Sequence, residues 1–277
     1  MPPALRSSAL VLLLALPWLW PFTSGPTAAT QPYLAGLGVA ALLLLAWPPD
    51  VDTGTRALRA GWLLAALASA VIALLQYFNL EAPLFPWVNQ AQTGQAFGNL
   101  RQPNQLATLL VIGLLALAAQ ARAGRLSVWL TAALGVSLLT ALAATASRVG
   151  AVELLLLGAL CLWWVRGSGS LRRAGALLAA AWLVYALAAL ALPWALQASE
   201  GQGGRDLIER LREGEGTCGS RLILWRNVLH LIALRPWTGW GWGELDYAHY
   251  IHPFAGERFC VLLDNAHNLP LHLAVEL

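Results

Sequence analysis

Residues 106–121, LATLLVIGLLALAAQA, form an uncharged apolar run with polar residues on both sides. A helix that crosses the hydrocarbon core of a bilayer needs about 20 mostly apolar residues, which this run reaches with its flanking turns. Six more runs of this kind occur in the chain. The seven candidate spans cover residues 9–23, 33–47, 61–78, 106–121, 127–144, 149–165 and 174–196. This pattern predicts an all-α polytopic integral membrane protein.

The composition supports this class. Of the 277 residues, 58% are hydrophobic and 11% are charged, and the mean hydropathy is +0.61. A soluble domain of this size needs more charge to cover its surface. The net charge of +3 is too small to indicate a nucleic-acid-binding protein. All 17 basic residues are arginine, whose planar and permanently charged group suits phosphate.

The arginines in the short loops predict the orientation of the chain, because cytoplasmic loops carry an excess of basic residues. Eight arginines lie before the first span or after the second, fourth and sixth spans, in loops that alternate along the chain. They are Arg6, Arg56, Arg59, Arg122, Arg125, Arg166, Arg172 and Arg173. The opposite short loops carry only Arg101 and Arg148. We therefore expect a cytoplasmic N terminus, with these two arginines on the outer side.

The spans and loops predict four sections. Residues 1–98 hold three spans and an irregular loop, and residues 99–196 hold four spans with two polar motifs. Residues 197–267 form a large polar loop, which the same alternation places outside. Residues 268–277 begin an eighth span that the end of the chain cuts short.

Two polar motifs lie at the outer ends of predicted spans. In FGNLRQPNQLATLL, Pro103 suits the first turn of a helix, and helix N-terminal N–H groups beside an arginine form an anion site. Arg101, Gln102 and Asn104 are therefore candidate substrate ligands, although Asn104 alone also fits an ordinary helix cap. In TASRVG, Arg148 either binds phosphate or extends to lipid headgroups. Glu153, inside the sixth span, is costly in lipid unless Arg148 or a backbone group pairs with it.

The large loop contains a charged stretch, a helical pattern and a glycine-rich turn. Residues 200–216 alternate in charge, which predicts a solvated helix or linker. Residues 220–236 predict an interfacial amphipathic helix with Arg221 at its start, a cap at Ser220 and Pro236 after its end. The expected apolar stripe of this helix is Leu222, Trp225, Leu229 and Ile232. In WTGWGWGE, the tryptophans suit the headgroup layer and the glycines permit a tight turn.

The motif DNAHN precedes the last apolar run. If a helix begins within it, Asp264 and His267 face the same way, and the carboxylate would raise the basicity of the imidazole. A hydrogen-bonded cap is the alternative role for this histidine. HYIH, residues 249–252, has a metal-binding spacing without an evident third ligand, so the sequence predicts no metal site. Cys218 and Cys260 are able to close the loop with a disulfide if it is extracytoplasmic.

Five motifs together resemble the O-antigen ligase and polymerase superfamily: GNLRQPNQLATLL, SRVG, GSRLILWRNVL, RPWTGWGWGE and DNAHNLPLHLAVEL. The RQPNQ form is most similar to the bacterial protein O-oligosaccharyltransferase branch, the PglL type. The resemblance covers about residues 99–277. The family usually continues with further C-terminal helices, which predicts that this chain is C-terminally truncated.

The resemblance implies an inverting, metal-independent glycosyltransferase with a GT-C-like fold and no cofactor, in the bacterial inner membrane with a periplasmic active face. The donor would be an oligosaccharide on undecaprenyl pyrophosphate. The acceptor would be a Ser or Thr hydroxyl of a pilin-like protein, or lipid A–core in the ligase branch. The family pattern maps onto six residues: Arg101, Gln102, Asn104, Arg148 and Arg221 as pyrophosphate or glycan ligands, and His267 as the essential histidine. We expect His267 to act as the general base, with Asp264 as its orienting carboxylate.

Three other functions stay open. A polymerase of the same superfamily would use similar arginines to extend a glycan. A transporter is disfavoured because the chain shows no inverted repeat and no mid-span charge except Glu153. In a structural or assembly protein the motifs would only cap helices, so substitution of Arg148, Arg221 or His267 would impair folding without a selective loss of turnover.

Overall fold

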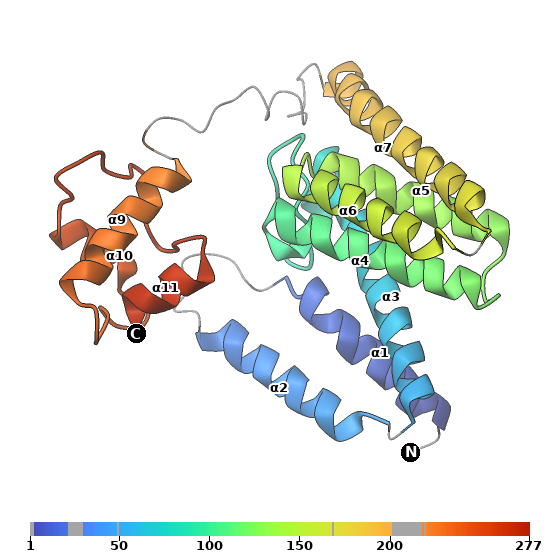
Figure 1. Cartoon of the computed structure of the whole chain (residues 1–277), viewed down its shortest axis with the longest axis horizontal. Helices are drawn as coiled ribbons and strands as arrows, with labels where there is room; N and C mark the ends of the chain where they lie inside the picture. Colours follow the sequence, from blue (N-terminus) through green and yellow to red (C-terminus); the bar gives the residue numbers. More distant parts are fainter. Residues whose placement is uncertain (1–2, 22–29, 49, 168, 201–217, 219) are drawn as a thin grey trace. The chain divides into compact units, whose positions relative to one another are not determined.

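The computed structural model describes the chain except for residues 1–2, 22–29, 49, 168, 201–217 and 219. The chain divides into two compact units, Met1–Arg210 and Leu211–Leu277. All regular structure in the described residues is helical (Figure 1). The predicted all-α polytopic membrane fold is confirmed. The charged stretch 200–216 lies outside the described residues apart from Glu200, which ends a helix.

The helices of the first unit follow the seven predicted spans. They are α1 (Pro3–Leu19), α2 (Thr30–Ala46), α3 (Val51–Tyr77), α4 (Pro103–Arg122), α5 (Val128–Ala144), α6 (Arg148–Val165) and α7 (Leu171–Glu200). By length and composition, α3, α4, α6 and α7 are able to cross a membrane, whereas α1, α2 and α5 are shorter apolar helices. The helix α7 continues past residue 197, so the first residues assigned to the large loop are helical.

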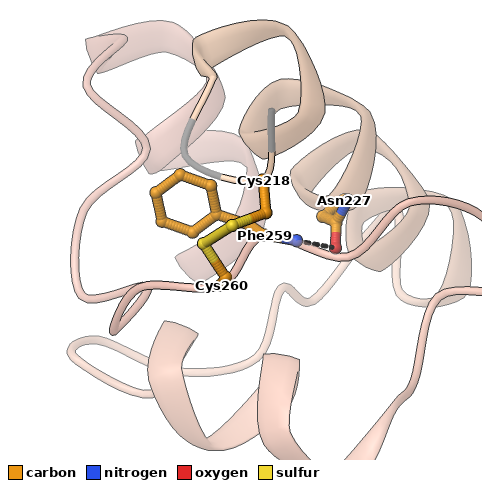
Figure 2. The surroundings of a disulfide bond; sticks show 4 residues. All are labelled: Cys218, Asn227, Phe259 and Cys260. Carbon is orange, nitrogen blue, oxygen red and sulfur yellow. Dashed lines mark hydrogen bonds between the residues drawn. A yellow bond between two sulfur atoms is a disulfide. The ribbon is translucent and has the colours of Figure 1, made fainter. Parts of the chain in front are cut away.

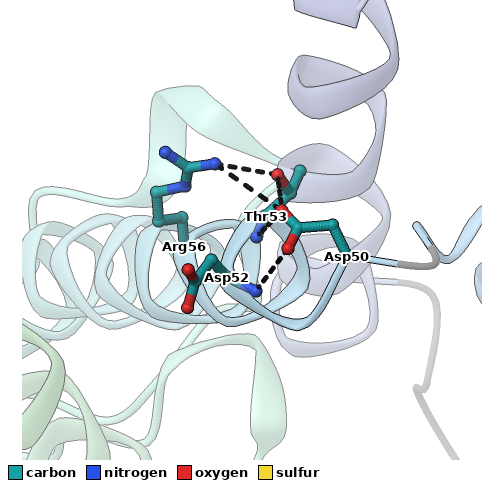
Figure 3. A network of polar contacts seen from close by, with 4 residues as sticks. All are labelled: Asp50, Asp52, Thr53 and Arg56. Carbon is teal, nitrogen blue, oxygen red and sulfur yellow. Dashed lines mark hydrogen bonds and ion pairs between the residues drawn. The ribbon is translucent and has the colours of Figure 1, made fainter.

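The helix α3 begins ten residues earlier than its predicted span, and Asp50 explains this start. The Asp50 carboxylate accepts hydrogen bonds from the backbone N–H groups of Asp52 (3.3 Å) and Thr53 (2.9 Å) and from the Thr53 hydroxyl (2.6 Å; Figure 3). Arg56 lies 3.9 Å from this carboxylate. These hydrogen bonds, the Thr53 hydroxyl first, lower the pKa of Asp50 below its ordinary value. The predicted cytoplasmic loop is therefore the capped first turns of α3.

The helices of the first unit pack closely where small residues face one another. α3 lies against α1, α4 and α5, and α4 also lies against α5 and α6. A side-chain carbon built on Gly113 of α4 would overlap the Cβ of Ala66 in α3. One built on Gly150 of α6 would lie 2.8 Å from the Cβ of Ala107 in α4. Glycine lets these backbones approach closely, as is common between membrane helices.

Buried amides fix the loop between α3 and α4. This loop contains the 3-10 helices η1 (Ala82–Leu84) and η2 (Gly98–Leu100). Gln76, fully buried, donates to the carbonyls of Asn89 and Gly98 and accepts from the N–H groups of Phe97 and Gly98. Asn99 is also buried and donates to Leu19 O at 2.8 Å. The path of the chain into α4 is therefore determined by satisfied polar groups.

The second unit contains α9 (Arg221–Leu234), α10 (Leu245–Ile251) and α11 (Leu269–Glu276) around a small apolar core. The predicted apolar stripe of α9 is partly wrong. Leu222 and Leu229 are 58% and 52% exposed, and the buried side consists of Ile223, Leu224, Asn227, Val228 and Leu231. This orientation buries four apolar side chains and gives the Asn227 amide hydrogen-bond partners inside the unit.

Candidate functional site

The starts of α4 and α6 lie side by side and join the two polar motifs of the first unit. The Ser147 hydroxyl donates to Asn104 Oδ1 at 2.7 Å. Ser147 is buried and caps α6 by accepting from the Gly150 N–H at 3.1 Å. Gln102 caps α4 by accepting from the Gln105 N–H at 2.7 Å. The cap of α4 is therefore Gln102, and Asn104 instead connects one motif to the other.

A second polar contact between the same two helices lies one turn further along. The Thr108 hydroxyl lies 2.7 Å from Glu153 Oε1 and 3.1 Å from the carbonyl of Asn104. Glu153 Oε2 is buried without a hydrogen-bond partner. The expected pairing of Glu153 with Arg148 or a backbone group is therefore wrong, and a threonine of α4 takes that place. This contact, together with Asn104–Ser147, keeps the two helix starts aligned.

Two arginines lie beside these helix starts. Arg148 is the first residue of α6, and its side chain is exposed. Arg101 ends η2 just before α4, in the left-handed region at φ 58°. The N-terminal ends of two helices carry partial positive charge and unpaired N–H groups. Two guanidinium groups and two helix starts at one end of the unit make this region attractive to an anion such as phosphate.

In the second unit, Arg221 is the first residue of α9. Ser220 caps this helix as predicted, accepting from the Ile223 N–H at 3.3 Å. Cys218 and Cys260, whose pairing the sequence left open, form a disulfide with a Cα–Cα distance of 5.3 Å (Figure 2). Arg221 is exposed, at the end of the helix nearest to this disulfide.

Asn227 is the centre of a buried network that the sequence did not reveal. Its Nδ2 donates to the carbonyls of Ile223 (2.8 Å) and Glu257 (3.0 Å). Its Oδ1 lies 3.1 Å from His249 Nε2 and accepts from the Phe259 N–H at 3.4 Å. Burial, and then the nearby Arg258 guanidinium, lower the pKa of His249 below its ordinary value. Apart from Ile223, the partners of Asn227 come from segments distant in the chain, so only the tertiary fold shows this residue to be internal.

The turn WTGWGWGE packs against the end of α11. The N–H groups of Trp240 and Gly241 donate to Val275 O (2.9 Å) and Glu276 O (3.0 Å), and the Gly243 N–H donates to Glu276 Oε1 (3.1 Å). Gly239 has φ 55°, and a side-chain carbon there would overlap the backbone of Glu276. Glycine is required at this position by both conformation and space.

His267 lies just before α11, which begins at Leu269 with Asn268 as its cap. The His267 backbone N–H donates to Asn265 Oδ1 at 2.8 Å, and its φ is 49°. Asp264 and His267 are therefore not on a common helix face, and no hydrogen bond or ion pair joins these two described residues. Both side chains are exposed. The carboxylate–imidazole contact of α11 is instead His272–Glu276, at 3.7 Å.

The two histidines of HYIH have separate structural partners. His249 contacts Asn227, whereas the ring of His252 lies 4.6 Å from that of Trp240. Among the described residues, no group of three or more His, Cys, Asp and Glu side chains is arranged to hold a metal ion.

Comparison of the chain with profiles of known protein families gives two matches. A family profile described as "O-Antigen ligase" matches residues 133–277, which is more than half of the chain. The chain belongs to the O-antigen ligase family. A second profile, "Protein glycosylation ligase", matches residues 96–119, which include Arg101 and the start of α4. The chain is therefore a multi-pass membrane protein of a glycosyltransferase-type enzyme family.

One relative has a named activity. A protein of Acinetobacter baylyi named "General O-oligosaccharyltransferase" is 28% identical over 225 residues, which cover 76% of this chain. The chain spans 37% of the length of that relative. No solved structure matches the chain.

Proposed function

We propose that the protein transfers an oligosaccharide from undecaprenyl pyrophosphate to a Ser or Thr hydroxyl of a pilin-like protein, with inversion and without a metal. The observation that carries this proposal is the Asn104–Ser147 hydrogen bond, which brings together two arginine-bearing helix starts. The name of the Acinetobacter relative supports a protein acceptor. The reaction takes place at the periplasmic face of the inner membrane, with the N terminus in the cytoplasm.

The proposed reaction needs positively charged groups that stabilise the departing pyrophosphate more than it needs an acid that protonates it. Departure of a pyrophosphate leaves negative charge on its oxygens, which fixed guanidinium groups stabilise in a water-poor site. Arg148 and Arg221 bind the pyrophosphate, and Arg101 assists. Gln102 and Asn104 position the donor and the helix starts.

The acceptor hydroxyl must lose a proton as it attacks. His267 takes this proton, and general-base catalysis of this kind typically contributes about 10²- to 10⁴-fold in rate. Asp264 is three residues away and shows no bond to His267, so its orienting role requires a rearrangement when substrate binds. An Asp264→Asn variant with unchanged turnover would remove Asp264 from the mechanism.

The second candidate is an O-antigen ligase that transfers the glycan to lipid A–core, which the description of the matching family favours. A polymerase would instead extend the glycan itself. The three functions share the donor and differ in the acceptor. Purified gene product is incubated with labelled undecaprenyl-pyrophosphate oligosaccharide, EDTA and either pilin-like protein or lipid A–core. Label on the protein supports our proposal, label on lipid A–core supports the ligase, and a longer lipid-linked glycan supports the polymerase.

A matched pair of arginine variants tests the binding site in the same assay. Arg148 and Arg122 lie at the α6 start and the α4 end respectively, and both are exposed. We expect Arg148→Ala to lower turnover about 10²- to 10³-fold, the usual loss for one electrostatic donor, and Arg122→Ala to have little effect. Equal effects of the two substitutions would contradict the proposed site.

A further inference from the structure

The disulfide of the second unit fixes the chain just ahead of α9. Cys218 and Cys260 are 42 residues apart in sequence, and their Cα atoms lie 5.3 Å apart. The Cys260 N–H also donates to the Cys218 carbonyl at 3.2 Å. One covalent bond and one hydrogen bond therefore hold residue 218, three positions before Arg221.

The partner side of the disulfide is itself firmly held. Residues 257–260, here called the strap, are bound to α9 by Asn227, which donates to the Glu257 carbonyl and accepts from the Phe259 N–H. The Phe259 ring is buried in the core of the unit. Figure 2 shows Asn227, Phe259 and the disulfide as one cluster. The disulfide thus links the strap, held by Asn227 and by the buried Phe259 ring, to the chain just before α9.

Arg221 occupies the part of α9 that most needs such support. The first turn of a helix has N–H groups without intrahelical partners, and it frays most easily. Arg221 and Leu222 are exposed, and the residues that hold α9 by burial begin at Ile223. The backbone that carries Arg221 is therefore held by Ser220 as a cap and, further back, by Cys218 as an anchor.

We propose that Cys218 and Cys260 are positioning residues for Arg221, so that the protein binds its pyrophosphate-linked donor tightly only with the disulfide formed. This inference rests on the role of Arg221 in the proposed function. Two-electron reduction by a dithiol breaks the S–S bond, gives two cysteine thiols and converts the dithiol into its own cyclic disulfide. A small-molecule disulfide oxidant takes the two electrons back and restores the bond.

The test compares oxidised and reduced protein for binding of labelled undecaprenyl pyrophosphate and for KM and kcat. A Cys161→Ser background removes the remaining cysteine, which lies in α6. Loss of one hydrogen bond to a charged group predicts about 10- to 100-fold weaker binding on reduction. We expect a similar rise in the donor KM, a fall in kcat because Arg221 also stabilises the departing pyrophosphate, and full recovery of both on reoxidation. Unchanged binding on reduction, with the thiols shown to be free, would overturn the inference.

A double-mutant cycle separates positioning from general support of the fold. In Arg221→Ala, reduction should weaken binding no further, because the group that the disulfide positions is gone. In Arg226→Ala, an exposed arginine one turn further along α9, the full effect of reduction should remain. Equal effects of reduction in both variants would show that the disulfide only supports the fold.

Two further outcomes are informative. If reduction unfolds the protein, Ser220→Ala replaces reduction as the test, because it loosens the same first turn with the disulfide intact. This substitution should weaken donor binding when Arg221 is present and have no effect in Arg221→Ala. The absence of that dependence contradicts the inference. If the oxidised protein neither binds the donor nor transfers a glycan, the proposed function fails together with the inference. If the protein binds the donor and transfers the glycan equally well in the oxidised and the reduced state, only the inference fails.

Discussion

At the scale of the residue, His267 carries the largest predicted effect on catalysis. We expect His267→Ala to lower turnover about 10²- to 10⁴-fold at unchanged donor binding, because a general base acts on the acceptor and not on the pyrophosphate. His230 of the same unit, whose ring lies 5.3 Å from that of Phe254, provides the matched histidine control. Near-normal transfer by His267→Ala would disprove the base assignment.

Asn227 has a different residue-scale role, which concerns stability. Asn227→Ala leaves the Phe259 N–H, the Glu257 carbonyl and His249 without their shared partner. Unsatisfied buried groups of this kind cost about 1–3 kcal/mol each, so we expect a clearly lower unfolding temperature. The measurement is thermal unfolding in detergent. A melting temperature equal to that of the parent protein would show that water replaces the amide without cost.

His249 makes the stability of the second unit depend on pH. Its pKa is lowered in the folded state from 6.5, so the unfolded chain binds a proton more readily. This contribution to stability is present above the unfolded pKa and is lost as the pH falls through the lower, folded pKa. The Asn227 amide contacts the His249 ring, and the Arg258 guanidinium donates to the His249 carbonyl. We expect His249→Gln to flatten the loss of stability measured below pH 6.5 by thermal unfolding.

At the scale of the element, the crossing of α4 and α6 determines where Arg148 lies. Gly150→Ala would place a methyl group 2.8 Å from Ala107 Cβ and 2.9 Å from Leu142 Cδ1, and would push the start of α6 away from α4. Overpacking of this kind costs about 1–3 kcal/mol, and here it also disturbs the Asn104–Ser147 contact. Gly158→Ala, in the same helix, meets Leu178 only at 3.5 Å and serves as the control. We expect a raised donor KM for Gly150→Ala but not for Gly158→Ala. Equal donor KM values for the two variants would contradict this role of the crossing.

The helices themselves were largely predictable from the sequence, and their contacts were not. Long apolar runs between polar flanks locate α4 and α6 within a few residues. Ser220 was identified as the cap of α9 because a small hydroxyl residue before a helical pattern is a local signal. The partner of Glu153 is Thr108, 45 positions away, and nothing local indicates it. The buried face of α9 was also missed, because the partners of Asn227 come from the distant strap.

At the scale of the whole molecule, the disulfide should contribute strongly to the stability of the second unit. Closing a loop with a sequence separation of 42 removes conformational entropy from the unfolded chain worth about 4 kcal/mol in the simple chain model. We expect Cys218→Ser/Cys260→Ser to unfold this unit at a clearly lower temperature than Cys161→Ser. Hydrogen exchange resolved by residue measures this, with the helices of the first unit as the internal reference. Equal loss of protection in both units would contradict a local effect.

Some features of the candidate site were also predictable from local sequence, whereas others depend on contacts between residues far apart in the chain. The RQPN and SRVG motifs were recognisable in sequence, and the structure shows that Asn104 and Ser147 join them. Asp264 and His267 do not share a helix face, because the helix begins at Leu269, after both residues. The roles of the arginines and of His267 stay predictions that the variants above test.

The most direct test of the account is transfer of a labelled oligosaccharide from undecaprenyl pyrophosphate by the purified gene product. The reaction contains EDTA, a pilin-like acceptor and, in parallel, the Arg148→Ala and Arg122→Ala variants. We expect label on Ser or Thr of the acceptor, unaffected by EDTA, lost with Arg148→Ala and retained with Arg122→Ala. Folded, donor-binding protein that transfers no glycan to any hydroxyl acceptor would contradict it.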